Sequence, residues 1–484
     1  MKKLAIFFVC FCVGLCGYYL YSSVTNMRFG ISPLEFKMDG KFNGVPKILV
    51  NGEPSFTTYD GVEALSMNVL YPNTIQIGNT VQKVKIDTLQ KDQYIPLQLR
   101  YADQTVFVKL YTVPQNMPQY KIEKTSDSYI SDGYVLTSFH TLMLNQSSYI
   151  VIINGQGDLV YYRGTNHPKT TTFHFQKFNV DDKTLFSHHI QTEPSLTGAW
   201  ILGDNVVMDD KFNVIDTVHI LSTDRHPEMP ADQHDFVILG ENHYLLVGYW
   251  NEKYQLSDGT SKTLVSAIVQ EQKDGKVLFD WVSSDYPITF DMCIEKCPTS
   301  DHKIADYVHI NTVSVDPKDN NLILSLASPY AVVKINRVSG DVMWILSGEK
   351  DEFNVPSQYK LTRQHDAYME NGELVVFDNA YSSLANDEVE QHAAFFKQQT
   401  GRMLRFKLDE VNKKVLSVSE VPLNEQARYM GSAQRLDDNL IFFGCGSSAE
   451  CAAKAVKWDG SEVWKMTVQQ PYTTYRAYWM DKIN

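Results

Sequence analysis

A strand-rich unit recurs six times between Gly133 and the C-terminus of this 484-residue chain. Each copy holds an apolar strand, a turn with Asp, Asn or Gly, a second apolar strand, and a strand pair that closes on a glycine. The clearest copies start at His234, His309 and Gly431, and fainter copies start at Gly133, His174 and His365. The copies average roughly 60 residues, which suits a propeller blade with long insertions. We therefore predict an all-β fold with a six-bladed β-propeller over residues 121–484.

Residues 27–120 form a separate region with shorter strands. Alternating apolar and polar residues predict strands at 81–86, 95–100 and 105–111. Pro114 and Pro118 then interrupt the strand pattern and indicate a linker. We expect a small N-terminal β-sandwich domain before the propeller.

The first 26 residues are predicted to be a signal peptide or an N-terminal membrane anchor. Lys2 and Lys3 precede an almost unbroken apolar run over residues 4–21, and no similar run recurs later in the chain. The residues after this run do not make a clean cleavage site, which favours an uncleaved anchor. Because positive charge stays on the cytoplasmic side, either alternative sends the rest of the chain across the membrane.

Four cysteines lie outside this apolar head, in two close pairs: Cys293 with Cys297, and Cys445 with Cys451. In an oxidising compartment, two local disulfides are the simplest of three possible pairings. Four reduced thiols and a four-cysteine zinc site are the alternatives. The spacings CIEKC and CGSSAEC lack the usual form of a zinc knuckle.

The charge of the chain argues against nucleic acid as a partner. The sequence has 44 Lys and Arg residues against 57 Asp and Glu residues, a formal net charge of −13. No basic excess is therefore available to neutralise a phosphate backbone.

Histidine recurs at one position of the repeat. His174, His234, His309 and His365 each open the first strand of a unit. In a propeller the innermost strands line the central channel, so residues at one register converge on its mouth. We expect these imidazoles to share one funnel. Such a set suits either group transfer, through a nucleophile and proton donors, or a catalytic divalent metal ion.

Several segments resemble the arylsulfotransferase (aryl sulfate sulfotransferase) family in register and order. They are DYVHINTVSVDPKDNNLILS, KINRVSGDVMWILSG, RQHDAYMENGELVVFDN and the terminal YRAYWM. The resemblance extends from about residue 75 over most of the chain. It implies an N-terminal β-sandwich, a six-bladed propeller and export to the bacterial periplasm.

The resemblance also implies a reaction. An aryl sulfate donates its sulfuryl group to a phenolic acceptor through a sulfohistidine intermediate, with no nucleotide cofactor. His365 matches the family's nucleophile, and His309 and His234 match histidines that bind the sulfuryl oxygens or move protons. His174 is expected to add a fourth imidazole for binding. The segment with Tyr475 and Arg476 is expected to close the last blade.

One position departs from the family pattern. The family has an arginine in an S-x-R step after the HIN strand, and Ala327 occupies that place here. Arg363, two residues before His365, is the candidate substitute if strand alternation puts both on one face. A membrane-anchored propeller that binds without turnover is the main alternative function. A histidine-ligated metal hydrolase is a weaker one, because the motif has no carboxylate-rich ligand set, and no metal site is predicted.

Overall fold

The computed structural model describes residues 117–483 except 126–132, 142–145, 158, 166–169, 194–199, 256–258, 300–303 and 382–399, and the backbone of eight strands before residue 113. The chain divides into two compact units after Met117. The predicted signal peptide or anchor, residues 1–26, lies outside the described residues. Within the described part of the chain, no helix is both long and apolar enough to cross a membrane.

The described strands of the N-terminal unit form two β-sheets. One has the strand order β1-β7-β8-β2-β3 and the other β4-β5-β6. The strands are β1 (Leu34–Lys37), β2 (Lys47–Asn51), β3 (Glu53–Thr57), β4 (Met67–Leu70), β5 (Thr74–Ile77), β6 (Thr80–Lys83), β7 (Tyr94–Tyr101) and β8 (Gln104–Thr112). Strands β7 and β8 coincide with two of the predicted strands. The sandwich itself stays a prediction, because the side chains of these strands lie outside the described residues.

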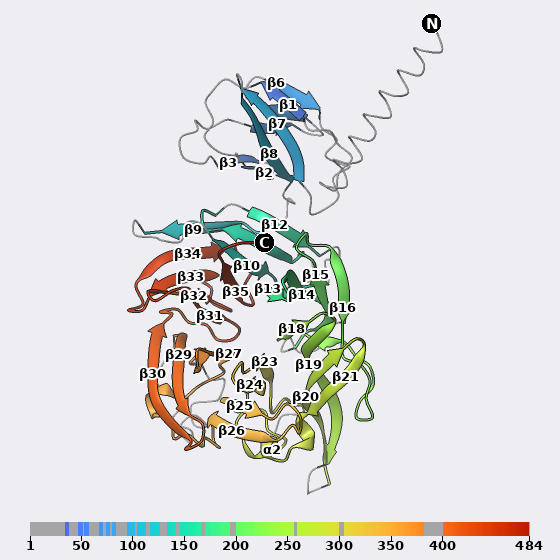
Figure 1. Cartoon of the computed structure of the whole chain (residues 1–484), viewed down its shortest axis with the longest axis vertical. Coiled ribbons are helices and arrows are strands. Elements are labelled where there is room, and N and C mark those ends of the chain that lie inside the picture. The colour runs from blue at the N-terminus through green and yellow to red at the C-terminus, as the bar shows by residue number, and fades with distance from the viewer. Residues whose placement is uncertain are drawn as a thin grey trace, which may run out of the picture. The chain divides into compact units, whose positions relative to one another are not determined.

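The second unit is a six-bladed β-propeller, as predicted from the repeat, with its sheets arranged around a centre (Figure 1). Four blades follow the chain from the inner to the outer strand. The second blade has β13 (Thr172–Val180), β14 (Lys183–Gln191), β15 (Leu202–Met208) and β16 (Val214–Val218), with β17 (Ala231–Asp232) at its side. The third has β18 (Phe236–Gly240), β19 (His243–Gln255), β20 (Ser261–Lys273) and β21 (Lys276–Val282), with β22 (Ile304–Ala305) beside β20.

The fourth and fifth blades repeat this arrangement without additional strands. The fourth has β23 (Ile310–Val315), β24 (Leu322–Leu326), β25 (Ala331–Ile335) and β26 (Val342–Ser347). The fifth has β27 (His365–Glu370), β28 (Glu373–Asp378), β29 (Arg402–Asp409) and β30 (Lys414–Pro422).

Two strands from opposite ends of the propeller unit complete the first and last blades. The first blade has β10 (Tyr134–Phe139), β11 (Tyr149–Asn154), β12 (Leu159–Gly164) and, beside β10, β35 (Ala477–Met480). The last blade has β31 (Ser432–Arg435), β32 (Leu440–Gly444), β33 (Ala453–Lys457), β34 (Glu462–Val468) and, beside β34, β9 (Tyr120–Lys124). The expectation that Tyr475 and Arg476 close the last blade is therefore wrong. Their segment leads into the first blade, because the inner edge of β10 needs a pairing strand.

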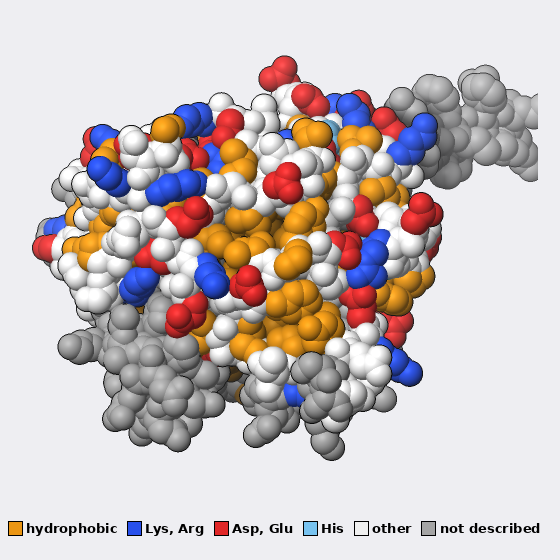
Figure 2. Space-filling model, turned by 90° about the horizontal axis from the view of Figure 1, so that it is seen from below, with side chains coloured by type: hydrophobic (Ala, Val, Ile, Leu, Met, Phe, Trp, Pro, Cys, Tyr) orange, Lys and Arg blue, Asp and Glu red, His pale blue; other side chains and the backbone are white. Residues whose placement is uncertain are grey.

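Helical turns are short and lie in the loops between blades. The structure has η2 (Ser283–Asp285), α2 (Ile288–Asp291) and η3 (Ser357–Tyr359) among the residues it describes. On the face drawn in Figure 2, acidic and basic side chains are mixed around a band of hydrophobic ones.

The hydrophobic core lies between neighbouring blades. Leu245 and Val247 of β19 belong to one buried cluster with Leu324 of β24 and Val333 of β25. Every residue of β24 and of β25 is buried, because each sheet is covered on both faces. Strands buried on both faces have continuous apolar sequences, which explains the short apolar runs of the repeat.

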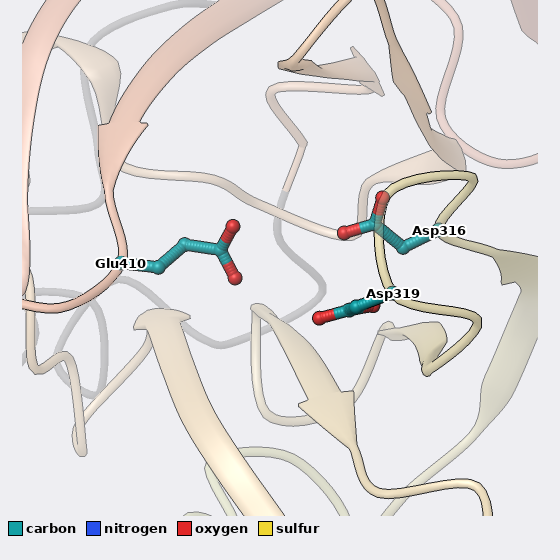
Figure 3. Close-up of side chains that lie close together, drawn as sticks. All are labelled: Asp316, Asp319 and Glu410. Carbon is teal, nitrogen blue, oxygen red and sulfur yellow. The ribbon is translucent and has the colours of Figure 1, made fainter.

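A buried ion cluster connects the fourth and fifth blades. Nζ of Lys334, on β25, lies 2.6 Å from Asp316 Oδ2, 2.8 Å from Asp319 Oδ2 and 2.8 Å from Glu410 Oε2. Figure 3 shows Asp316 and Asp319 on one loop and Glu410 opposite them. Burial alone would lower the pKa of Lys334, but the three carboxylates outweigh burial and raise it. The ammonium group therefore stays charged and holds the two blades together.

Candidate active site

The four predicted histidines lie at the beginnings of inner strands. His365 is the first residue of β27, His309 directly precedes β23, His234 lies two residues before β18, and His174 is the third residue of β13. The ladders of β13, β23 and β27 shift register at or next to these positions. Such β-bulges redirect side chains and are common beside active sites.

Two of these histidines adopt a left-handed backbone conformation. The φ angle is 49° at His174 and 44° at His309. Positive φ is uncommon for residues other than glycine and costs free energy that the surrounding structure has to offset. Backbone strain of this kind clusters at functional sites, which agrees with a site at the ends of these strands.

His234 and His309 face one another, with ring centroids 4.9 Å apart in an edge-to-face arrangement. Nδ1 of His309 bonds to Oδ2 of Asp306 at 2.7 Å, and Nδ1 of His234 bonds to Oδ1 of Asp232. Both carboxylates are buried. They make Nδ1 the donor of each ring. Nε2 of each ring has no partner among the described residues and is therefore available to a ligand or a proton.

Burial and charge act in opposite directions on the Asp306–His309 pair. Burial lowers the pKa of His309 and Asp306 raises it, and with the charges of His234 and Lys296 added the pKa lies below its ordinary value. Burial also raises the pKa of Asp306, but His309 and Lys296 outweigh this effect and hold that pKa below its ordinary value. At neutral pH the pair is therefore mainly a carboxylate and a neutral imidazole with a basic Nε2.

His365 has partners on both ring nitrogens. Nδ1 donates to Asn379 Oδ1 at 2.8 Å and to the carbonyl oxygen of Arg363 at 3.0 Å. Nε2 accepts a hydrogen bond from the backbone N–H of Met430 at 3.1 Å. Burial and the charge of Arg476 lower the pKa of His365 well below its ordinary value. The imidazole is therefore neutral, with its lone pair on Nε2, as a nucleophile requires.

Arg476 lies beside His174 at the buried end of the cluster. Its Nη1 donates to Nε2 of His174 at 3.3 Å and to the hydroxyl of Tyr478 at 3.2 Å. Its Nη2 donates to the carbonyl oxygen of Asn311 at 2.6 Å and to Oγ1 of Thr312 at 3.0 Å. Its Nε has no partner in the described part of the chain. Because His174 is buried and bonded to an arginine, it differs from the more accessible His309.

Two buried carboxylates accompany Arg476. Nη1 lies 3.3 Å from Asp366 Oδ1 and 3.6 Å from Asp235 Oδ2. Burial raises the pKa of Asp235 to about 6 although Arg476 opposes the shift, and it also raises the pKa of Asp366. The guanidinium remains charged and, together with burial, it lowers the pKa of His174 and of His365.

Arg363 is held by a buried carboxylate. Its Nη2 lies 2.5 Å from Glu295 Oε2, and its Nε lies 3.1 Å and 3.0 Å from the two carboxylate oxygens. Its Nη1 makes no hydrogen bond among the described residues. Arg363 precedes β27 and has a φ of 52°, so the predicted strand alternation with His365 does not apply. The two residues are nevertheless connected, since the Arg363 carbonyl accepts from His365.

Ala327 lies directly beside His309. Its backbone N–H donates to the carbonyl oxygen of His309 at 2.9 Å, and its side chain is buried. Lys296 lies close to this place: its Nζ is 3.7 Å from Asp306 Oδ2, the oxygen that bonds to Nδ1 of His309. A cation is therefore present near His309 although position 327 has none.

The cysteines form the two local disulfides that were predicted. Cys293 is bonded to Cys297 and Cys445 to Cys451, each with a Cα–Cα distance of 5.7 Å. Because all four cysteines are disulfide-bonded, the structure contradicts both alternatives, reduced thiols and a four-cysteine zinc site.

Potential metal donors gather elsewhere in the fold. Among the described residues, three donor atoms close enough to share a metal ion meet at Asp316, Asp319 and Glu410. Nζ of Lys334 lies among these carboxylates and offsets part of their negative charge. They belong to the ion cluster between the fourth and fifth blades, and the histidine cluster is built from different residues.

Several residues of this site were not predicted from the sequence. They are Asp232, Asp306, Glu295, Lys296, Asn379, Met430 and Arg476. A signal existed for Asp232 and Asp306, which stand two and three residues before a repeat histidine. Glu295 and Lys296 had a weaker signal, two charged residues enclosed by a cysteine pair.

Comparison with protein families gives one match. The model of the family described as Arylsulfotransferase (ASST) matches residues 119–478. The matched part includes the whole histidine cluster and Arg476. No curated protein matches the chain.

Solved structures similar to the chain have low sequence identity. A protein of unknown function from Bacteroides caccae is 10% identical over 73% of this chain and 100% of its own, with a TM-score of 0.39. Virginiamycin B lyase from Staphylococcus aureus is 10% identical over 72% of this chain and 99% of its own, with a TM-score of 0.27. A putative 6-phosphogluconolactonase from Bacteroides fragilis is 8% identical over 74% and 99%, with a TM-score of 0.32. At these TM-scores they carry no argument about this chain.

Proposed function

The chain belongs to the arylsulfotransferase family, and from this premise we propose that it moves a sulfuryl group from an aryl sulfate to a phenolic acceptor without a nucleotide cofactor. The observation that carries the proposal is the meeting of His234, His309 and His365 inside the matched residues. Sulfuryl transfer, like phosphoryl transfer, spreads charge over equatorial oxygens. It therefore needs a positioned nucleophile and fixed donors.

His365 is the proposed nucleophile. Its neutral Nε2 attacks the sulfur of the donor, a nitrogen–sulfur bond forms, and the bond between sulfur and the aryl oxygen breaks. The electron pair of that bond leaves with the aryl oxygen, which takes a proton from Nε2 of a protonated His309 or departs as phenolate. The Met430 N–H has to release Nε2 before attack, because it occupies the lone pair.

The second step returns the enzyme to its first state; where the first leaving group departed as phenolate, the proton that His309 gains in this step passes to solvent. The acceptor phenol loses its proton to Nε2 of His309 while its oxygen attacks the sulfur. The nitrogen–sulfur bond breaks, and its electron pair returns to Nε2 of His365. Two successive displacements through one covalent intermediate predict ping-pong kinetics. His234 lies 4.9 Å from His309 between ring centroids and supplies a further Nε2 to the transferring oxygens.

Two arginines support the transfer in different ways. Nη1 of Arg363 is the proposed donor to a sulfuryl oxygen, since Glu295 fixes the other side of the guanidinium. Arg476 is buried and bonded to protein groups, so it acts through its charge. Loss of one hydrogen-bond donor to the oxygens of a transition state typically costs about 2.7 to 4 kcal/mol of stabilisation.

A propeller that binds aryl sulfates without turnover is the second candidate. Two observations favour it: Ala327 stands where the family has an arginine, and the Met430 amide occupies the lone pair of His365. A metal hydrolase is the third candidate, and sensitivity to a chelator separates it from the other two.

We further propose that the protein works outside the cytoplasm, attached to the membrane by residues 4–21. The two disulfides and the family are consistent with an extracytoplasmic location. Cell fractionation with and without high salt tests the anchor: release of the chain into the soluble periplasmic fraction contradicts it.

The deciding experiment measures 4-nitrophenol release from 4-nitrophenyl sulfate by the full chain, purified with a mild detergent. Phenol is added as acceptor, a chelator is present or absent, and His365→Ala is compared with the wild type. The proposal expects release that phenol stimulates, the chelator leaves unchanged and the variant abolishes. No release by the folded protein over a range of phenols and pH values supports the binding propeller instead.

Mass spectrometry of the quenched enzyme then tests which histidine is sulfated. A label on His365 is expected. A label that appears on His309 or His234, each with an unpartnered Nε2, overturns the assignment of the nucleophile while leaving the transfer reaction intact.

A further inference from the structure

The five-residue loop closed by the Cys293–Cys297 disulfide carries two adjacent charged residues that both reach the site. Glu295 is buried, whereas the side chain of Lys296 is 33% exposed. Lys296 has a φ of 50°, a left-handed conformation that the closed loop has to maintain. The Glu295 N–H donates to the carbonyl oxygen of Ser328 at 3.1 Å, which fixes the loop on the turn after β24.

Glu295 reaches the site through Arg363. Both carboxylate oxygens bind the guanidinium, and Oε1 also accepts from the hydroxyl of Tyr330. A bidentate carboxylate–guanidinium contact fixes the plane of the guanidinium as well as its position. The direction of Arg363 Nη1 therefore depends on Glu295.

Lys296 reaches the site through Asp306. Its Nζ lies 3.7 Å from Oδ2 of Asp306, the same oxygen that bonds to Nδ1 of His309 at 2.7 Å. A positive charge at this distance competes with His309 for the carboxylate and disfavours a proton on the ring. The loop thus contacts two of the groups assigned to the transfer, one through each charged residue.

We propose that Glu295 and Lys296 are positioning residues of the sulfuryl-transfer site, and that the Cys293–Cys297 disulfide holds them in place. Glu295 orients Arg363 toward the sulfuryl oxygens, and Lys296 sets the proton affinity of His309 through Asp306. This inference rests on the function proposed above. It adds that a loop between the third and fourth blades, outside the repeat, tunes the site.

The test uses the full-length protein and two readouts. The first is the KM and kcat for 4-nitrophenyl sulfate with phenol as acceptor. The second is the NMR titration of the His309 ring, assigned with His309→Gln, which needs no turnover. Besides burial, Asp306, His234 and Lys296 act most strongly on the pKa of His309, and His365 and Tyr249 are further titratable groups close to its ring. The second readout separates failure of the loop proposal from failure of the proposed function.

Four variants of this loop test the proposal. Glu295→Gln raises KM about tenfold with a smaller change in kcat, because Arg363 loses its anchor. Lys296→Met moves the His309 titration to higher pH, and Lys296→Arg restores it. The Cys293→Ser/Cys297→Ser double variant shows both effects.

Matched controls exclude general effects of charge and stability. Lys183→Met and Glu241→Gln remove one exposed ion pair of 3.0 Å and leave both readouts unchanged. Cys445→Ser/Cys451→Ser removes the other disulfide and leaves the His309 titration unchanged. The proposal is overturned if folded Lys296→Met titrates as the wild type and folded Glu295→Gln keeps its KM, or if the controls shift as much as the loop variants.

Discussion

The backbone amide of Met430 donates to Nε2 of His365 at 3.1 Å, the nitrogen assigned to nucleophilic attack. Tyr429, the preceding residue, exchanges two hydrogen bonds of 3.1 Å with Ser447 in the loop of the second disulfide. Asn379 contacts both partners: Oδ1 accepts from His365 Nδ1 at 2.8 Å, and Nδ2 donates to the Met430 carbonyl at 2.8 Å. One asparagine therefore fixes the tautomer of the nucleophile and also binds the residue whose N–H blocks it.

Asn379→Ala should slow formation of the sulfated enzyme by about 10- to 100-fold, because the ring loses the partner that keeps the proton on Nδ1. The KM for the donor should change little, since Asn379 faces away from the sulfuryl oxygens in the proposed mechanism. Rapid-quench measurement of the first turnover with 4-nitrophenyl sulfate checks this. Asn412→Ala, in an exposed hairpin turn, is the control. An unchanged first turnover in Asn379→Ala would show that His365 needs no orienting partner.

His309 should couple the rate to pH in a way that depends on the leaving group. Burial lowers the pKa of His309, so its protonated form is lost as the pH rises toward neutrality. Phenyl sulfate, with a poor leaving group, needs that proton more than 4-nitrophenyl sulfate does. The ratio of kcat/KM for 4-nitrophenyl sulfate over phenyl sulfate should therefore increase with pH.

The variant His309→Gln tests this coupling. Its ratio should be larger than that of the wild type at low pH and independent of pH. A ratio that still follows pH in His309→Gln assigns the proton to another group, of which His234 is the nearest candidate by ring distance.

The repeat made the fold and the histidine register predictable, because every blade buries the same faces and presents the same strand start to the centre. The residues that contact those histidines could not be predicted from the repeat. Arg476 precedes β35, a strand that completes the first blade from the far end of the chain and has no counterpart in the repeat. No local pattern in YRAYWM indicates that its arginine meets His174, 302 residues away.

The loop contacts were unpredictable for a related reason. Glu295 and Arg363 are 68 residues apart, and they meet because a disulfide-closed loop lies on the turn after β24. The cysteine pair predicted the disulfide, since its spacing permits a local bridge. The cysteine spacing did not predict where the side chains of Glu295 and Lys296 point. That orientation depends on the backbone conformation at Lys296 and on the packing of the fourth blade.

Removal of Lys334 should destabilise the propeller without touching the site. Lys334→Met leaves the three carboxylates of Asp316, Asp319 and Glu410 within 4.8 Å of one another and without the buried cation that they share, although the exposed Lys318 still lies 3.2 Å from Glu410. The expected loss in the free energy of unfolding at pH 7 is about 3 to 5 kcal/mol. Urea denaturation measures it, with Lys183→Met as the control for loss of an exposed lysine.

The cost of Lys334→Met should shrink in acid. Lys334 holds the pKa of Asp319 and of Glu410 below the ordinary values against the effect of burial, which acts upward. The stability they contribute in the wild type is therefore present above about pH 4 to 4.5 and lost as the pH falls further. The variant lacks this contribution, so the two proteins should converge at low pH. A difference that stays constant from pH 7 to pH 3 would place the cause in packing rather than in charge.

Asp235 should give stability the opposite dependence on pH. Burial raises its pKa to about 6 in the folded protein, against an ordinary value of about 3.9 in the unfolded chain. The folded state therefore favours the protonated form. The stability from this protonation is complete below about pH 3.9 and is lost as the pH rises through about 6.

Asp235→Asn removes this linkage. The free energy of unfolding of the variant, relative to the wild type, should increase by about 2 to 3 kcal/mol between pH 4 and pH 7. Urea denaturation across this range measures it, and Asp274→Asn in an exposed turn is the control. Because Arg476 lies 3.6 Å from Asp235, the alternative is a carboxylate that stays ionised throughout the range. In that case the relative stability of Asp235→Asn does not change with pH, and Arg476 rather than burial determines the state of the charge beneath the histidines.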